Sequence, residues 1–128
     1  MPKRDIRMTE VEVAAFLETR TLATVVAGAE DQAPHAALAD FRYRDGAASF
    51  TVPLGSQVAQ ALADDDRACC IIDQRPFEAA ESSYYDTKSV MLHGRARQVD
   101  GGPPGMAAFE LAVEKIVSFD FAKLRTEA

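Results

Sequence analysis

Long apolar runs and basic residues are scarce in this sequence of 128 residues, and each scarcity argues against a class of protein. No apolar run approaches the roughly 18–20 residues that a membrane-spanning helix needs. The 14 basic residues are outnumbered by 20 acidic ones, giving a formal net charge of −6. Because nucleic-acid phosphates and anionic membranes attract a basic face, we expect neither as a partner. The polar residues before Thr9 also disfavour a secretion signal.

Cysteine and histidine are equally scarce. The only cysteines, Cys69 and Cys70, are adjacent, so on a strand they would point to opposite faces. This predicts neither a disulfide nor a zinc pair, and we interpret both as small hydrophobic residues in a reducing compartment, with the cytoplasm as the default. The two histidines have no cysteine or carboxylate at ligand spacing, so no metal site is expected.

The chain contains no Ser-His-Asp order, no P-loop and no G-x-G-x-x-G motif, which leaves hydrolysis and nucleotide-triphosphate chemistry without support. Its 48% hydrophobic content is enough for one core. The length predicts a single domain over 1–128. Because a domain of this size still exposes a large share of its surface, dimerisation would bury more of it.

Short β-branched and alternating apolar runs predict six strands, and turn signals separate them. The Asp45-Gly46 dipeptide is typical of a tight hairpin turn. In the fifth strand, alternation places Val90, Leu92, Gly94 and Ala96 on one face. The predicted strands cover residues 21–27, 35–43, 47–52, 67–73, 88–99 and 115–121.

Helix signals are fewer. Thr9 and Glu12 match a capping box, which predicts a helix over 10–18. We expect its buried stripe to contain Val11, Ala14, Ala15 and Phe16 or Leu17. Ser56 is a good N-cap for a second helix ending near Ala63. A third short helix is predicted over 106–112, after a glycine- and proline-rich breaker.

Hairpin connections dominate this order of elements, which favours an antiparallel barrel with helices at its ends over a parallel α/β sheet. The fold class is therefore mainly β, with six antiparallel strands and two or three short α-helices.

An ordered set of motifs over about residues 9–100 resembles a known family. The set comprises Thr21-Leu-Ala-Thr-Val, Pro34-His35, Asp45-Gly46, Leu54-Gly55-Ser56, the run Asp66–Ile72 and the run Ser89–Ala96. In this order they resemble the FMN-binding split-barrel family of pyridoxamine 5'-phosphate oxidase-like proteins, which includes flavin reductases and deazaflavin (F420) reductases. The resemblance implies a six-stranded antiparallel split β-barrel.

The resemblance also implies a homodimer with flavin at the subunit interface. In the family, the second strand and the end of the third line the isoalloxazine ring, and the start of the following helix takes the phosphate. Carried over to this sequence, the implied cofactor-binding residues are His35, Ala37, Leu38, Asp40, Thr51, Val52, Pro53, Ser56, Gln57 and Val58.

Ser56 suits the phosphate because a hydroxyl and free N–H groups meet at a helix N-terminus. Oxidases of the family carry an Arg-Lys pair directly after this serine, whereas this chain has Gln57 and Val58. The phosphate would lose two charge-assisted contacts, each on the order of 1.5–3 kcal/mol. The cations that could replace them are Arg42, Arg44, Arg67, Lys88, Arg95 and Arg97.

The implied function is a flavin-dependent oxidoreductase that transfers hydride between FMN, or F420, and a small organic substrate. The flavin supplies the redox chemistry, so no protein acid–base pair is expected. The chain ends without the C-terminal segment of true pyridoxamine-phosphate oxidases, so we expect a different enzyme. The alternatives are a non-enzymatic barrel that binds flavin or haem at a degenerate site, and a structural dimer whose pocket has closed.

Overall fold

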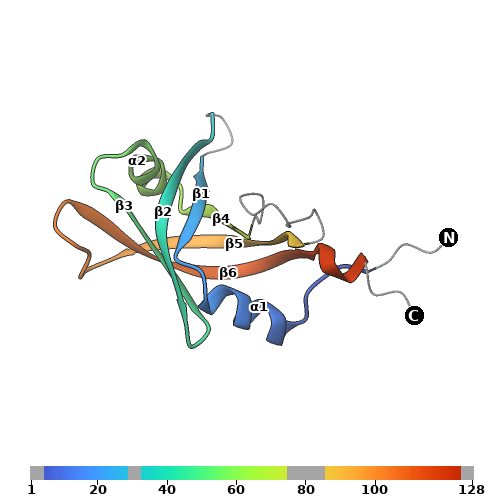
Figure 1. Ribbon diagram of the computed structural model, residues 1–128. Helices are drawn as coiled ribbons and strands as arrows, with labels where there is room; N and C mark the ends of the chain where they lie inside the picture. The colour runs from blue at the N-terminus through green and yellow to red at the C-terminus, as the bar shows by residue number, and fades with distance from the viewer. Residues whose placement is uncertain (1–4, 29–32, 75–85, 125–128) are drawn as a thin grey trace, which may run out of the picture.

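The protein is described by a computed structural model over residues 5–28, 33–74 and 86–124, which forms a six-stranded barrel with two α-helices (Figure 1). The elements in chain order are α1 (Glu10–Glu18), β1 (Leu22–Ala27), β2 (His35–Arg44), β3 (Ala47–Pro53), α2 (Gln57–Asp64), β4 (Arg67–Gln74), β5 (Lys88–Val99), β6 (Met106–Asp120) and the 3-10 helix η2 (Phe121–Leu124).

The strands close into a barrel in the order β1-β2-β3-β6-β5-β4, with β4 pairing back to β1. All six pairings are antiparallel, which confirms the predicted fold class. The β2–β3 hairpin turns at Asp45 and Gly46, whose φ angles are 52° and 80°. Positive φ at both positions is what the predicted tight turn requires.

Alternate residues of the strands fill the barrel interior, except over the exposed run 112–116 of β6. The predicted face of β5 is confirmed, because Val90, Leu92, Gly94 and Ala96 are all buried. Phe50 of β3 and Phe109 of β6 are register partners whose rings stack with centroids 5.3 Å apart. Phe50 and Phe109 therefore join β3 and β6 inside the barrel, beneath the outer face of these two strands.

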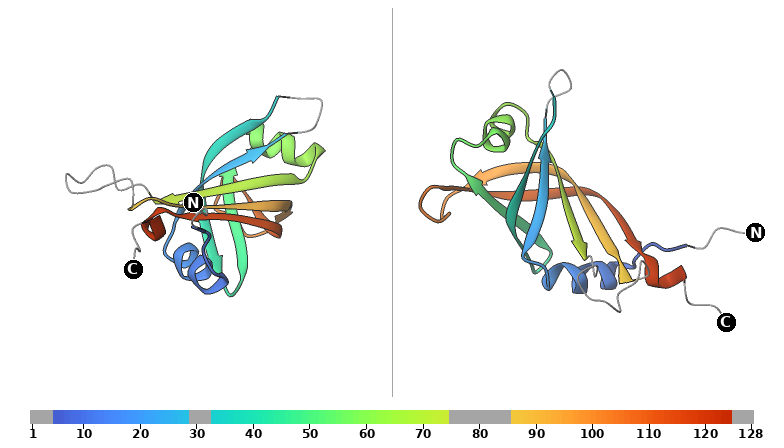
Figure 2. Two further views of the ribbon diagram at one scale, coloured as in Figure 1. Left: turned by 90° about the vertical axis from the view of Figure 1, so that its right-hand side faces the viewer. Right: turned by 45° about the horizontal axis from the view of Figure 1, so that its top comes forward.

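The helices lie at opposite ends of the barrel, α1 beside the C-terminal half of β6 and α2 beyond the ends of β1 and β3 (Figures 1 and 2). Both begin as predicted, after Thr9 and Ser56. The predicted buried stripe of α1 is wrong in part: Val13, Phe16 and Leu17 are buried and Ala14 is half-buried, whereas Ala15 is exposed and Val11 is 79% exposed. The buried residues have i, i+3, i+4 spacing, and Val11 falls outside that stripe.

The helix predicted over 106–112 is wrong, because these residues begin the long strand β6. Ala107, Phe109 and Leu111 are buried in alternation, and β6 pairs with β3 on one side and β5 on the other. Alanine, glutamate and leucine favour helices locally, but two ladders of hydrogen bonds and the burial of Phe109 outweigh that propensity.

The second half of β6 inverts the usual pattern of apolar residues inside. Ser118 and Asp120 are buried, while the alternating residues Val117 and Phe119 lie on the outer face. Both buried polar groups are hydrogen-bonded: Ser118 Oγ accepts from the Met8 N–H at 2.9 Å, and Asp120 Oδ1 accepts from the Ala122 N–H at 3.0 Å. Hydrogen bonding of this kind removes most of the cost of burying a polar group.

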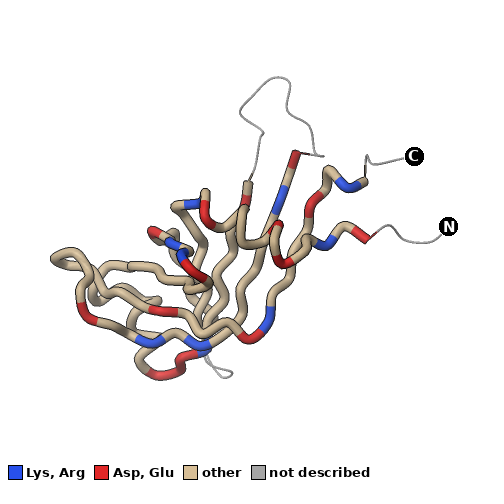
Figure 3. Tube along the Cα trace, turned by 90° about the horizontal axis from the view of Figure 1, so that it is seen from below, with Lys and Arg blue, Asp and Glu red and all other residues tan. Residues whose placement is uncertain are grey.

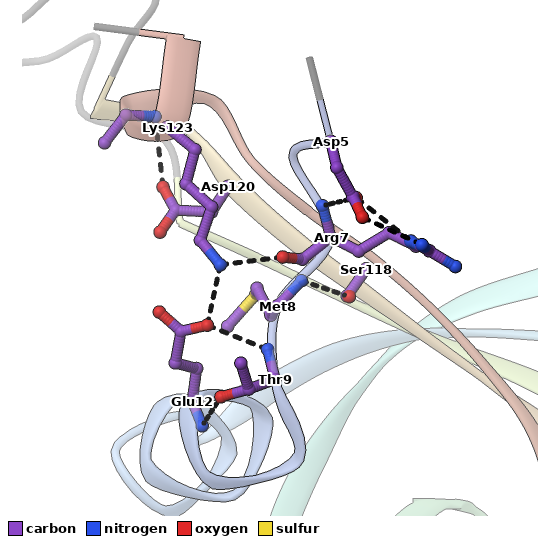
Figure 4. Close-up of polar contacts among 9 residues, drawn as sticks. Asp5, Arg7, Met8, Thr9, Glu12, Ser118, Asp120 and Lys123 are labelled. Carbon is purple, nitrogen blue, oxygen red and sulfur yellow. Dashed lines mark hydrogen bonds and ion pairs between the residues drawn. The ribbon is translucent and has the colours of Figure 1, made fainter. Parts of the chain in front are cut away.

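The two ends of the described chain meet beside α1 (Figure 4). Lys123 Nζ donates to the carbonyl oxygen of Arg7 and to Glu12 Oε1, both at 2.7 Å. Glu12 also accepts from the Thr9 N–H, while Thr9 Oγ1 accepts from the Glu12 N–H, completing the predicted capping box. The Glu12 carboxylate thus caps α1 and joins this helix to η2. No helix among the described residues is long and apolar enough to cross a membrane.

The Glu12 carboxylate should make the fold sensitive to acid. The hydrogen bond from Lys123, with the backbone hydrogen bond from Thr9, lowers the pKa of Glu12 from 4.5 to about 2. A depressed carboxyl pKa contributes stability that is full above pH 4.5 and is lost as the pH falls towards 2. We therefore expect the thermal unfolding midpoint to fall over that window, and Lys123→Met to make the fall shallower.

Lys115→Met is the matched control, because Lys115 is exposed and has no ion-pair partner among the described residues. Calorimetry at a series of pH values measures both variants. An acid profile that Lys123→Met leaves unchanged would contradict the assignment to Glu12.

Candidate functional site

A groove of about 1000 Å³ lies over the outer faces of β2, β3 and the first half of β6. The strand register explains its floor: Asp40 of β2 pairs with Thr51 of β3, which pairs with Ala108 of β6. Residues of the loop 101–103 form one wall. The volume is at the upper end of the range typical of small-molecule and cofactor sites.

Cations gather on the β2 side of the groove. Arg42 and Arg44 lie two residues apart on the outer face of β2, and both are exposed. Neither has an ion-pair partner among the residues that the structure describes. Arg20 also lines the groove, with its guanidinium 5.4 Å from the ring centroid of Phe16.

The remaining candidate cations lie elsewhere or are paired. Arg95 pairs with Asp66, and Arg97 pairs with Glu110 at 2.9 Å. Lys88 lies at the far end of β5, opposite Gln74. Basic and acidic positions are mixed along the described trace (Figure 3). Of the six cations that the sequence left open, only Arg42 and Arg44 line the groove.

Acidic side chains also line the groove, so it is not uniformly positive. Asp40 is exposed on its floor, and Glu18 and Asp45 stand at its edge. A carboxylate on the floor repels an anionic group placed beside it and accepts hydrogen bonds from N–H donors. The electrostatics therefore favour a ligand with its anionic part away from Asp40.

Four of the residues implied by the resemblance share the outer face of the barrel. These are Leu38, Asp40, Thr51 and Pro53. Asp40 and Thr51 line the groove, and Leu38 is 67% exposed on β2 two residues before Asp40. The structure thus brings these four side chains to one surface.

Other implied residues point away from this surface. Val52 is fully buried and Val58 is 2% exposed, both in the hydrophobic core. Ala37 packs against the same core. His35 is half-buried at the start of β2, opposite Ala27, and is absent from the groove lining. Val52 therefore exposes no surface to a ligand, and Val58 exposes only a small fraction of its own.

The start of α2 fits an anionic group through its backbone. Ser56 Oγ accepts from the Ala59 N–H at 3.2 Å, and the Ser56 carbonyl oxygen accepts from the Gln60 N–H. The N–H groups of Gln57 and Val58 precede the first intrahelical bonds and have no acceptor among the described residues. Two free donors and a helix dipole suit a phosphate, although no basic side chain follows Ser56.

Cys69 and His93 form a contact that the sequence analysis missed. They are register partners on β4 and β5, 24 residues apart, and Cys69 Sγ lies 3.9 Å from His93 Nε2. Burial raises the pKa of the Cys69 thiol, so Cys69 is a thiol at neutral pH. This argues against a thiolate nucleophile. Only the pairing of β4 with β5 brings the two residues together.

No family model matches the sequence, and no curated protein matches it. Solved structures do match its fold. A conserved hypothetical protein from Mycobacterium tuberculosis has a TM-score of 0.79 at 19% identity, covering 100% of this chain and 94% of its own. An FAD-binding protein from Mycobacterium smegmatis has a TM-score of 0.68 at 16% identity, covering 87% and 95%.

A haem-binding protein, also from Mycobacterium smegmatis, has a TM-score of 0.67 at 17% identity, covering 93% of this chain and 61% of its own. Likeness at this level of identity shows the fold alone. The split-barrel fold that the sequence motifs implied is therefore confirmed. Two of these three neighbours are named for a ligand, one as FAD-binding and one as haem-binding.

Proposed function

We propose that the protein is a flavin-dependent oxidoreductase of the pyridoxamine-phosphate-oxidase-like type, with FMN in the groove over β2 and β3. The single observation that carries the proposal is the groove itself, which Asp40 and Thr51 line on the outer face that they share with Leu38 and Pro53. Its volume of about 1000 Å³ accommodates a tricyclic ring with its ribityl chain.

When bound, FMN supplies hydride transfer, and the chain supplies position and electrostatics. Thr51 offers a hydroxyl to a polar ring edge, and exposed Leu38 offers an apolar surface on which a ring can rest. Asp40 accepts from a ring N–H and disfavours an anion beside it. The N–H groups at the start of α2 hold the phosphate.

We further propose that the protein works as a homodimer, with a second copy closing the groove. Three of its exposed large hydrophobic residues, Leu22, Leu38 and Leu54, are 52%, 67% and 59% exposed around this region. Leu22 pairs with Asp40 across β1 and β2, and Leu54 directly follows β3. Apolar side chains gathered beside a groove indicate a surface that another protein surface or a ligand covers.

The proposal is tested by titrating purified protein with FMN and following the quenching of flavin fluorescence. Ser56→Asp keeps a good helix cap and places a negative charge where the phosphate should bind. We expect its FMN affinity to fall at least about tenfold, which corresponds to about 1.4 kcal/mol. Thr9→Asp makes the same change at the cap of α1, away from the groove, and should bind FMN normally.

The outcomes separate the parts of the proposal. Wild-type protein that takes up no FMN at high micromolar concentration would overturn the FMN assignment. An FMN affinity that Ser56→Asp leaves unchanged would show that the phosphate binds away from α2. Bleaching of bound flavin by NAD(P)H supports the oxidoreductase, and F420 or haem would be recognised by its own absorption spectrum.

The second candidate is a non-enzymatic barrel that binds flavin or haem without turning over. One observation favours it: Gln57 and Val58 provide no cation beside the free N–H groups of α2. If dithionite reduces the bound flavin but NADPH, NADH and reduced F420 do not, the non-enzymatic candidate is supported over the enzyme.

A further inference from the structure

Cys69 and His93 occupy the outer face of β4 and β5, which the barrel order places on the side opposite β2 and β3. The proposed flavin groove therefore makes no use of them. Both side chains are partly buried on this outer face, with Cys69 Sγ 3.9 Å from His93 Nε2. A thiol and an imidazole are two of the ligands that Zn²⁺ prefers.

The separation of the two ligand atoms nearly matches what one zinc ion requires. With Zn–S of about 2.3 Å, Zn–N of about 2.0–2.1 Å and a tetrahedral angle, the sulfur and nitrogen lie about 3.6 Å apart. The observed 3.9 Å is reached by a small side-chain adjustment. The pair alone provides half a tetrahedral site, and the described residues contain no group of three potential ligands.

We propose that the Cys69–His93 pair is half of a zinc site, completed by the same pair of another copy around a two-fold axis distinct from that of the dimer that closes the groove. Two identical half-sites make a Cys₂His₂ tetrahedron, one of the closed structural sites typical of this ion. Sheets that pack face to face lie about 10 Å apart, a gap that a cysteine and one Zn–S bond span from each side.

The surroundings of the pair suit an interface with a second copy. Val26 pairs with Cys69 in the same row, and Ile71 and Met91 form the next row of the outer face. These apolar side chains are only partly buried within one chain. Arg67 and Arg95 are register partners beyond the pair, at the edge of this apolar area. An apolar centre with a charged rim is the usual anatomy of a protein interface.

Charge and protons balance in the proposed site. Each Cys69 thiol releases its proton to solvent as its sulfur bonds zinc, and two thiolates neutralise the ion. Exposed Lys115, the register partner of His93, then faces a neutral site rather than a dication. No oxidant or reductant is needed, and zinc affinity should fall as the pH is lowered.

The test loads the full-length protein, freed of metal and flavin, with Zn²⁺ and then with Co²⁺. We expect one zinc ion per two chains, a doubling of the molar mass of the zinc-free protein by light scattering, and a thiolate-to-cobalt charge-transfer band. Cys69→Ser and His93→Gln should each lower the zinc affinity at least about a hundredfold, more than the loss of a residue that only hydrogen-bonds a ligand.

Cys70→Ala is the matched control, because this neighbouring cysteine is fully buried and points into the core. It should keep the stoichiometry and the cobalt spectrum, with folding of every variant checked by thermal unfolding. One zinc per chain, an unchanged molar mass, or binding that survives Cys69→Ser would each overturn the shared site. Because no flavin is present, the outcome is independent of FMN binding.

Discussion

Gly94→Ala is expected to destabilise the fold by at least about 3 kcal/mol, towards or beyond the upper end of the usual cost of overpacking. A Cβ built at Gly94 would lie 2.0 Å from the carbonyl oxygen of Ala112 and 3.1 Å from the Cα of Val113. Both atoms belong to the backbone of β6, so no side-chain rotation relieves the clash. Urea unfolding followed by circular dichroism measures the loss.

The reason for this close approach is the register shift between His93 and Gly94 in the β5–β6 ladder. Gly94 lets the two backbones approach where the ladder is irregular, as glycine does at bulges. Gly102→Ala is the control, because its Cβ would come no closer than 3.2 Å to Met106 O. It should cost less than about 1 kcal/mol. A Gly94→Ala variant as stable as wild type would contradict the geometry.

Much of the barrel follows from short-range signals in the sequence. The Asp45-Gly46 turn, the alternation of β5 and the cap at Ser56 each specify structure within a few residues. These predictions are confirmed to within one or two residues. The error at 106–112 has the opposite cause, because only pairing with two distant strands makes this helix-prone segment a strand.

The candidate site was less predictable because it too depends on the pairing of strands that are distant in the sequence. Asp40 and Thr51 came from motifs carried over from a family, and the hairpin register places them together. Residues 101–103 line the groove because the strand that follows them, β6, pairs with β3. The Cys69–His93 contact depends on the β4–β5 register, and no local spacing in the sequence encodes it.

Phe50→Ala should have an effect of similar size, about 3–5 kcal/mol, because it removes a buried ring and leaves a cavity. Phe50 is 2% exposed, and its stacking partner Phe109 is 3% exposed. Calorimetry or urea unfolding measures the loss. Phe50→Leu keeps most of the volume and should cost clearly less, whereas equal losses would show that the site collapses around either residue.

The same substitution also tests whether the core supports the groove. Ser49 and Thr51 flank Phe50 on β3 and line the groove from the opposite face of the strand. A cavity beneath β3 should loosen both residues, so Phe50→Ala is expected to weaken FMN binding as well as stability. Leu92→Ala also leaves a large cavity, beneath β5 and away from the groove, and should lower stability alone. If both variants bind FMN as wild type does, the position of β3 does not determine the affinity of the groove.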